Sequence, residues 1–280
     1  THMARKHSKH LLPGFGLTTG ISLFYITLII LLPIAAMLLK VAGMGLPEFW
    51  RIISSRRAIA AYQITFSSAF YATLINGTVG LLLAWVLTRY RFPGRRVLDA
   101  LVDLPFALPT AVAGLVLVTL FAETGWYGQL LEPNGLKVNY TQLGIVLAMA
   151  FTSIPFVVRS VQPVLEEVDQ SLESAAETLG ANRWQVFTRI VWPTIMPAFI
   201  GGCVLSFARS LGEFGAVVFI AGNIPGVTEI VSLLIYIRLD EYNYEAAAAL
   251  AFVLLLVAFL TLVATNALSA WQTRYVERSA

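Results

Sequence analysis

Residues 173–180 read Glu-Ser-Ala-Ala-Glu-Thr-Leu-Gly, and residues 190–193 read Ile-Val-Trp-Pro. Together they mark a polar, helix-like stretch between two long apolar segments of a very apolar chain. A membrane protein gains nothing from a solvated segment between two spanning helices unless something outside the membrane binds there. The interpretation of the whole chain starts from this stretch.

The stretch predicts two short helices joined by a sharp turn. From Leu165 to Leu179, apolar residues recur at intervals of three and four, which indicates an amphipathic helix. Gly180 suits the left-handed conformation in which helices often end. Asn182, with Gln185 three residues later, approximates the capping box that starts a second helix. Residues 164–192 are called the elbow below.

The composition predicts an integral membrane protein. Of the 280 residues 58% are hydrophobic and 12% are charged, whereas charged residues make up about 25% of soluble proteins. A helix that crosses the hydrocarbon layer needs about 20 apolar residues. Uncharged runs of about this length are Leu17–Leu39, Ile64–Leu87, Leu104–Ala122, Val138–Val158, Ile190–Ala208 and Ala246–Thr273. The expected fold class is an all-α membrane protein with about six transmembrane helices.

The distribution of Lys and Arg predicts the orientation. With six spans, twelve of these residues fall on the side of the two termini and six on the opposite side. Positive charge favours the cytoplasmic side, so both termini are expected in the cytoplasm. Thr1 and His2, ahead of Met3, are interpreted as a remnant of cloning. The expected parts are a cytoplasmic tail (1–16), a transmembrane domain (17–273) that includes the elbow, and a second cytoplasmic tail (274–280).

The residues that enzymes use are scarce. Histidine occurs only at positions 2, 7 and 10, ahead of the first span. The chain contains neither a nucleophile elbow nor a phosphate-binding loop. Cys203 is the single cysteine, which excludes an intrachain disulfide and a cysteine-based metal site. We therefore expect no catalytic site, metal or cofactor in this chain, and no nucleic-acid partner, since no basic soluble face is present.

Three ionisable residues are expected inside the membrane: Asp103, Arg209 and Glu213. Such residues are costly in lipid and suggest a function by default. Arg209 and Glu213 are four residues apart on one helical face, so they can form a pair that fixes packing. Alternatively, Arg209 lines a path for anions and is partly balanced by Glu213 or Asp103. The sequence leaves both interpretations open.

The elbow also has two interpretations. It can be an ordinary amphipathic helix on the inner leaflet, or a surface on which a partner docks. Small residues at Ala175, Ala176 and Gly180 allow a partner to approach closely. Acidic residues on the same segment disfavour an anionic leaflet. They are Glu166, Glu167, Asp169, Glu173 and Glu177.

The elbow resembles the "EAA" loop of ABC-transporter permeases, Glu-Ala-Ala-x-x-x-Gly-x(9)-Ile-x-Leu-Pro. Ala175, Ala176, Gly180, Ile190 and Pro193 occupy its positions. Two positions depart from the pattern: Ser174 replaces the usual glutamate, with Glu173 one residue earlier, and Trp192 replaces leucine. The resemblance implies that a separate ATPase docks on Glu173, Ser174, Ala175, Ala176, Glu177, Leu179, Gly180 and Arg183.

Further blocks are similar to the oxyanion branch of this family, which handles sulfate and molybdate. They are 103–114, 150–159 and 207–226, and the similarity covers essentially residues 11–274. Over its full length the chain is most similar to CysT-type permeases of sulfate/thiosulfate import. The resemblance implies a type I importer of MetI-like fold in a bacterial-type inner membrane.

The resemblance also implies the partners. They are a second permease subunit, either a CysW-type relative or a copy of this chain, two ATPase subunits that bind ATP and Mg, and a periplasmic oxyanion-binding protein. Membrane lipid surrounds the spans. Three alternatives remain: a molybdate or tungstate permease, a gradient-driven secondary transporter, which would usually show paired repeats, and a membrane scaffold that binds an ATPase without transport.

Overall fold

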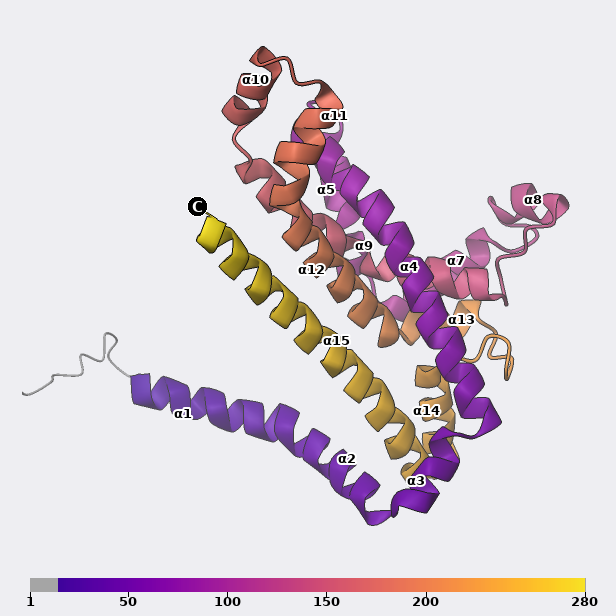
Figure 1. Ribbon diagram of the computed structural model, residues 1–280. Helices are drawn as coiled ribbons and strands as arrows, with labels where there is room; N and C mark the ends of the chain where they lie inside the picture. The colour runs from indigo at the N-terminus through magenta and orange to yellow at the C-terminus, as the bar shows by residue number, and fades with distance from the viewer. Residues whose placement is uncertain (1–14, 280) are drawn as a thin grey trace, which may run out of the picture.

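The computed structural model describes the backbone of residues 15–279 and the side chains of residues 15–264 except Gln170. The regular secondary structure of this part of the chain is entirely helical, and no strand occurs in it (Figure 1). In chain order the elements are α1 (Phe15–Ile26), the π-helical η1 (Thr27–Leu31), α2 (Leu32–Gly43), α3 (Leu46–Ile53), α4 (Arg56–Arg89), α5 (Arg95–Val102), α6 (Leu104–Ala107), α7 (Thr110–Leu120), α8 (Gly128–Leu131), the 3-10 turn η2 (Glu132–Asn134), α9 (Gln142–Glu167), α10 (Gln170–Thr178), α11 (Arg183–Val186), the π-helical η3 (Phe187–Val191), α12 (Trp192–Leu211), α13 (Gly215–Ile220), α14 (Val231–Asp240) and α15 (Tyr244–Ser279).

Five helices within the described range are long and apolar enough to cross a membrane. They are Phe15–Gly43, Arg56–Arg89, Gln142–Glu167, Arg183–Leu211 and the helix that starts at Tyr244. The remaining expected span, 104–122, is not one helix: α6 ends at Ala107, and the 11-residue α7 follows. Pro109 forces Leu108 into an extended conformation, with ψ of 134°, which breaks the helix.

Two of the spanning helices contain a π-helical turn just before a proline. The turn η1 precedes Leu32 and Pro33, and η3 precedes Trp192 and Pro193. Proline lacks the N–H that would continue the regular hydrogen-bond ladder, so the preceding turn widens. Both helices thus continue through their prolines with a local distortion and without a break.

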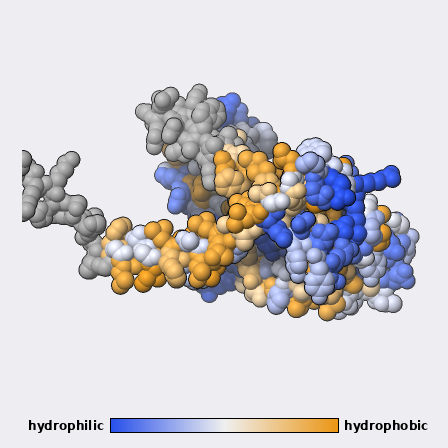
Figure 2. Space-filling model, turned by 90° about the horizontal axis from the view of Figure 1, so that it is seen from below, coloured by the Kyte–Doolittle hydropathy of each residue, from blue (hydrophilic) through white to orange (hydrophobic). Residues whose placement is uncertain are grey.

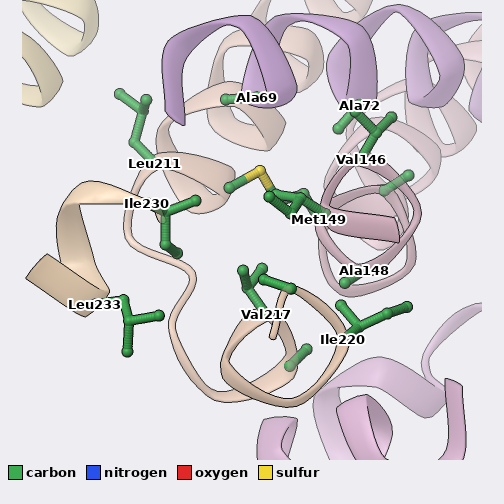
Figure 3. Packing of buried hydrophobic residues seen from close by; sticks show 14 of the residues in the cluster. Ala69, Ala72, Val146, Ala148, Met149, Leu211, Val217, Ile220, Ile230 and Leu233 are labelled. Carbon is green, nitrogen blue, oxygen red and sulfur yellow. The ribbon is translucent and has the colours of Figure 1, made fainter. Parts of the chain in front are cut away.

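The centre of the fold is the contact among α4, α9 and α12. The buried face of α4 repeats at helical spacing and consists mostly of small residues, which allow close approach of helices in lipid. These residues are Ala58, Ala61, Thr65, Ser68, Ala69, Ala72, Asn76, Gly77, Gly80, Ala84 and Leu87. The first of them, Ala58 and Ala61, pack against α14 and α15, and the rest of the face continues towards Leu87. Figure 3 shows Ala69 and Ala72 of α4 facing Val146 and Met149 of α9, with Val217 and Ile220 of α13 beside them.

The arm α1–η1–α2 leaves this bundle. Neither α1 nor α2 has a buried residue, and outside the arm α2 packs mainly along α15. In Figure 1 the arm diverges from α15 towards the N-terminal end, and Figure 2 shows that its surface is largely apolar. In a membrane this surface lies against lipid or against another apolar subunit.

The short helices α7 and α13 pack against each other next to α9 (Figure 1). Their backbones approach closely at Gly114, where an added Cβ would lie 2.4 Å from the carbonyl oxygen of Ala216. Since the obstacle is backbone, a side chain there cannot be accommodated by a rotamer change. Gly201 in α12, by contrast, has nothing within 4 Å of the same position.

We expect Gly114→Ala to destabilise the protein by about 1–3 kcal/mol, because it overpacks the α7–α13 contact. Thermal unfolding in detergent measures this effect, with Gly201→Ala as the matched control. Equal melting temperatures for the two variants would contradict the close backbone approach.

Candidate functional site

The elbow contains two short helices, α10 and α11, in the predicted order, with a turn at Gly180 between them. The helix α10 ends with a Schellman motif, in which the N–H of Ala181 bonds to Ala176 O and that of Gly180 to Glu177 O, both at 3.0 Å. Gly180 itself has φ of +89°. Asn182 and Gln185 then form a reciprocal capping box at the start of α11. The predicted turn at Gly180 and the predicted cap are both confirmed.

The start of the elbow differs from the prediction. We expected one amphipathic helix from Leu165 to Leu179, but α9 ends at Glu167, and Val168 and Asp169 are extended. Val168 is buried with Leu165 against the bundle, and Asp169 becomes the N-cap of α10. An N-cap of this kind starts a new helix directly after the break at Val168. The apolar periodicity in the sequence therefore continues although the helix itself is interrupted.

The cap at Asp169 is an electrostatic feature of the elbow. Its carboxylate accepts a hydrogen bond from the backbone N–H of Ser171 at 2.8 Å, and this bond lowers the pKa of Asp169. A carboxyl whose pKa is lowered on folding stabilises the fold above its unfolded pKa and loses this effect as pH falls through the folded pKa. At neutral pH the cap is therefore fully formed.

The outer face of the elbow exposes large apolar side chains. The exposed fraction is 56% for Leu172, 89% for Leu179 and 71% for Trp184. Ser174, Ala175, Glu177 and Arg183 are exposed beside them, and Ala176 is half-buried. Exposed apolar residues rimmed by polar ones mark a surface for another protein. Leu172 and Trp184 were not among the predicted docking residues, although an exposed Trp next to a helix cap is a usable signal.

Glu173 is turned away from this face. Its Oε1 accepts a hydrogen bond from Nη2 of Arg89 at 2.5 Å, and the two side chains are only 22% and 11% exposed. Arg89 is the last residue of α4, so this ion pair ties the first elbow helix to the end of a spanning helix. The guanidinium carbon of Arg89 also lies 5.6 Å from the ring centre of Trp85, a cation–π contact. The sequence did not indicate this partner.

Aromatic side chains tie the second half of the elbow to the same helix. The rings of Trp85 in α4 and Phe187 in η3 meet edge to face, 5.5 Å apart. Phe187 also stacks with the exposed Trp184 at 5.8 Å. A cavity of about 340 Å³ lies between the elbow and the end of α4, lined by Arg89, Glu173 and Phe187 among others. Both halves of the elbow are thus anchored to α4.

Arg209 and Glu213 lie together at the end of α12. Nη1 of Arg209 is 2.7 Å from Oε2 of Glu213, an ion pair outside hydrogen-bonding angles. Oε1 of Glu213 accepts the backbone N–H of Ala216 at 2.9 Å, close to the start of α13. The carboxylate is 1% exposed, and Arg209 is 32% exposed. The pair therefore holds the corner between α12 and α13.

Asp103 is not part of this pair, and it is paired with a different arginine from the one that the sequence suggested as an alternative. It lies between α5 and α6, ahead of the apolar segment, where both its oxygens accept hydrogen bonds from Arg159 of α9 at 2.7 and 2.8 Å. Asp99 accepts from the same guanidinium at 2.6 Å. Two carboxylates four residues apart share a helix face, and this signal could have suggested an arginine partner.

The described side chains offer no evident place for a metal ion. No group of three or more His, Cys, Asp or Glu side chains that could hold one occurs among them. Cys203 is a free, half-buried thiol in α12.

Breaking the Arg89–Glu173 pair should loosen α10. We expect Arg89→Gln to lower the local stability of the elbow by about 1–3 kcal/mol, because a largely buried carboxylate loses its charged donor. Hydrogen exchange of the α10 amides measures this change, and Arg189→Gln, at an exposed position with no ion pair to any described side chain, is the control. Unchanged exchange in the first variant would rule out the tether.

The family and the relatives of the chain agree with this geometry. The family model "Binding-protein-dependent transport system inner membrane component" matches residues 76–278. A protein of Escherichia coli (strain K12) named "Sulfate transport system permease protein CysT" is 55% identical over 271 residues, which cover 97% of each chain. A protein of the same name from Synechocystis sp. is 47% identical, covering 91% of this chain and 89% of its own.

Solved structures support the same fold. A bacterial ABC transporter involved in the import of the acidic polysaccharide alginate superposes with a TM-score of 0.77 at 19% identity, over 92% of this chain and 96% of that one. The MetNI methionine ABC transporter in an inward-facing conformation gives 0.58 at 17% identity, over 81% and 99%. With the family model and the near-full-length relatives, these findings place the chain in the family of inner membrane components of binding-protein-dependent transport systems, the permeases of ABC transporters.

Proposed function

We propose that this chain is the permease subunit of an ATP-driven importer that moves sulfate, and with it thiosulfate, from the periplasm to the cytoplasm. The observation that carries the proposal is the 55% identity, over 97% of both chains, with a protein named as a sulfate transport system permease. The likeness extends over nearly the whole length of both chains, which supports a shared substrate. The related molybdate and tungstate permeases are the second candidate.

In the proposed mechanism a separate ATPase docks on the elbow and binds ATP and Mg, since this chain is expected to hold neither. Leu172, Leu179 and Trp184 supply the apolar contact area that a stable docking surface needs. Closure of the ATPase moves α10. The elbow connects directly to α9 and α12, and Arg89 extends the connection to α4. The energy of transport thus enters through three spanning helices.

The remaining subunits follow from the family. We propose a second permease, either a CysW-type relative or a second copy, two ATPase subunits and a periplasmic oxyanion-binding protein. Selectivity then lies largely in the binding protein. The scarcity of charge in the spans supports this division, because a conduit that bound the anion strongly would not release it.

The Arg209–Glu213 pair is proposed to fix packing and not to select the anion. Glu213 is committed both to Arg209 and to the backbone of α13. Arg209→Ala leaves a buried carboxylate without its cation, so we expect poor assembly with unchanged anion preference in the assembled fraction. Size-exclusion yield and competition by molybdate measure the two effects. Full assembly with altered preference would favour a role in the anion path.

The proposed location is the inner membrane, with both termini in the cytoplasm. The elbow and the C-terminal end of α15 then lie at one end of the bundle, and α3 with the start of α4 at the other (Figure 1). With this orientation the turn that follows α8 is expected on the outer side. A cysteine at Gly135, in that turn, should react with a membrane-impermeant thiol reagent from the outside of intact cells. The cysteine-free parent, Cys203→Ala, is the control, and labelling of position 135 only in inverted vesicles would reverse the topology.

Uptake in proteoliposomes tests the function. The complete importer should accumulate labelled sulfate when ATP is supplied, and molybdate should compete poorly. Gly180→Val should abolish coupled uptake while the chain still inserts, because φ of +89° excludes a β-branched residue. Gly180→Asn, which tolerates this conformation at about 1 kcal/mol or less, should keep most of the activity. Normal uptake by the valine variant would refute the role of the elbow. ATP-driven molybdate uptake without sulfate uptake would refute the proposed substrate.

A further inference from the structure

A basic cavity lies at the turn between α4 and α5. It encloses about 560 Å³ and is lined by Arg91, Arg95 and Arg96, with Phe92, Val97 and Asp99 completing the wall. The three guanidinium groups come from a stretch of six residues, so their charges act on one small volume. The proposed function uses none of these arginines.

The three arginines form no ion pair with any described residue, whereas arginines on either side of them do. Arg89 is paired with Glu173, and Arg159 with Asp99 and Asp103. Asp99 is the one carboxylate of the cavity, and its Oδ1 already accepts a hydrogen bond from Arg159 at 2.6 Å. The cavity therefore presents uncompensated positive charge, and an anion is the ligand that fits it.

The apolar surface beside the cavity indicates what kind of anion this is. On α5, Leu98 and Val102 pack against the bundle, while Val97 and Leu101 are 64% and 53% exposed. In Figure 1, α5 lies beside the inner end of α4 and closer to the bundle than α10 does. An amphipathic helix with a basic end and exposed apolar side chains is typical of a helix in the membrane interface.

We propose that this cavity binds the headgroup of an anionic phospholipid of the inner leaflet. The phosphate accepts hydrogen bonds from Arg91, Arg95 and Arg96, and the acyl chains lie along Val97 and Leu101. A free inorganic phosphate would use the guanidinium groups but leave the apolar pair bare. A partner protein with both acidic and apolar groups would cover the site as well, and the test below separates it from lipid; the amphipathic character of α5 favours the lipid. Charge and apolar exposure together therefore favour the lipid.

Bound lipid would hold α5 in place. Asp99 within α5 and Asp103 directly after it are bonded to Arg159 of α9, so the position of α5 sets where the broken helix α6–α7 begins. Each basic residue near an anionic leaflet strengthens binding about fivefold. Loss of two arginines should therefore weaken lipid binding by about 25-fold. The inference requires only that the chain lies in the membrane, whatever anion it transports.

Native mass spectrometry of the chain, purified with its partner subunits and titrated with phosphatidylglycerol, tests the proposal. We expect Arg95→Gln/Arg96→Gln to weaken phosphatidylglycerol binding by about 25-fold, and Arg95→Lys/Arg96→Lys to keep most of it. The control Arg56→Gln/Lys137→Gln removes two exposed charges, expected on the outer side, that form no ion pair with any described residue. It should bind as the unchanged chain does. Hydrogen exchange outside α5 shows that each variant is folded.

Three outcomes would overturn the proposal. The first is equal phosphatidylglycerol binding by the glutamine variant and its control. The second is displacement of the lipid by inorganic phosphate at millimolar concentration, which would mean that the site takes a free anion. The third is unchanged lipid binding by the glutamine variant together with loss of a partner subunit, which would assign the arginines to a protein contact.

Discussion

The structure depends on a buried hydrogen-bonded contact among three helices. Nδ2 of Asn76 in α4 donates to Ser153 of α9 at 2.8 Å and to Ser206 of α12 at 3.0 Å, and Ser153 also lies 3.0 Å from Ser210. All four side chains are fully buried. Lipid provides little hydrophobic drive for helices to associate, so polar contacts and small residues hold them together. The contact makes α4, α9 and α12 one unit.

Because the three helices form one unit, a movement of the elbow is transmitted to all of them. The elbow is continuous with two of the three helices, and the Arg89–Glu173 pair and the Trp85–Phe187 contact attach it to the third. A displacement of α10 is therefore received by a rigid body and is not absorbed by a loose loop. Glu173 is used inside the chain, which leaves the exposed Glu177, Leu179 and Trp184 for the partner.

Local chemistry made part of this predictable. Apolar run lengths gave five of the six expected spans. The Gly180 stop and the Asn182 cap are encoded within a few residues, as hydrogen bonds to nearby backbone. The features that the sequence did not reveal are contacts between residues that lie far apart along the chain. Arg89 meets Glu173 across 84 positions, and Asp103 meets Arg159 across 56. The spacing of Asp99 and Asp103 suggests an arginine partner, but a single sequence does not say which arginine it is. The break at Val168 follows from its burial against the bundle, which periodicity alone does not reveal.

The central claim is that a separate ATPase delivers its force to the elbow. A photo-crosslinking residue at Leu179, the most exposed apolar position there, tests it directly in the complete importer. The account requires an adduct with the ATPase subunit, and none from the same residue placed at the exposed Leu130 of α8, which is expected on the outer side. The account would be contradicted by an importer that takes up sulfate normally but gives no ATPase adduct at Leu179, nor at its neighbours Leu172 and Trp184.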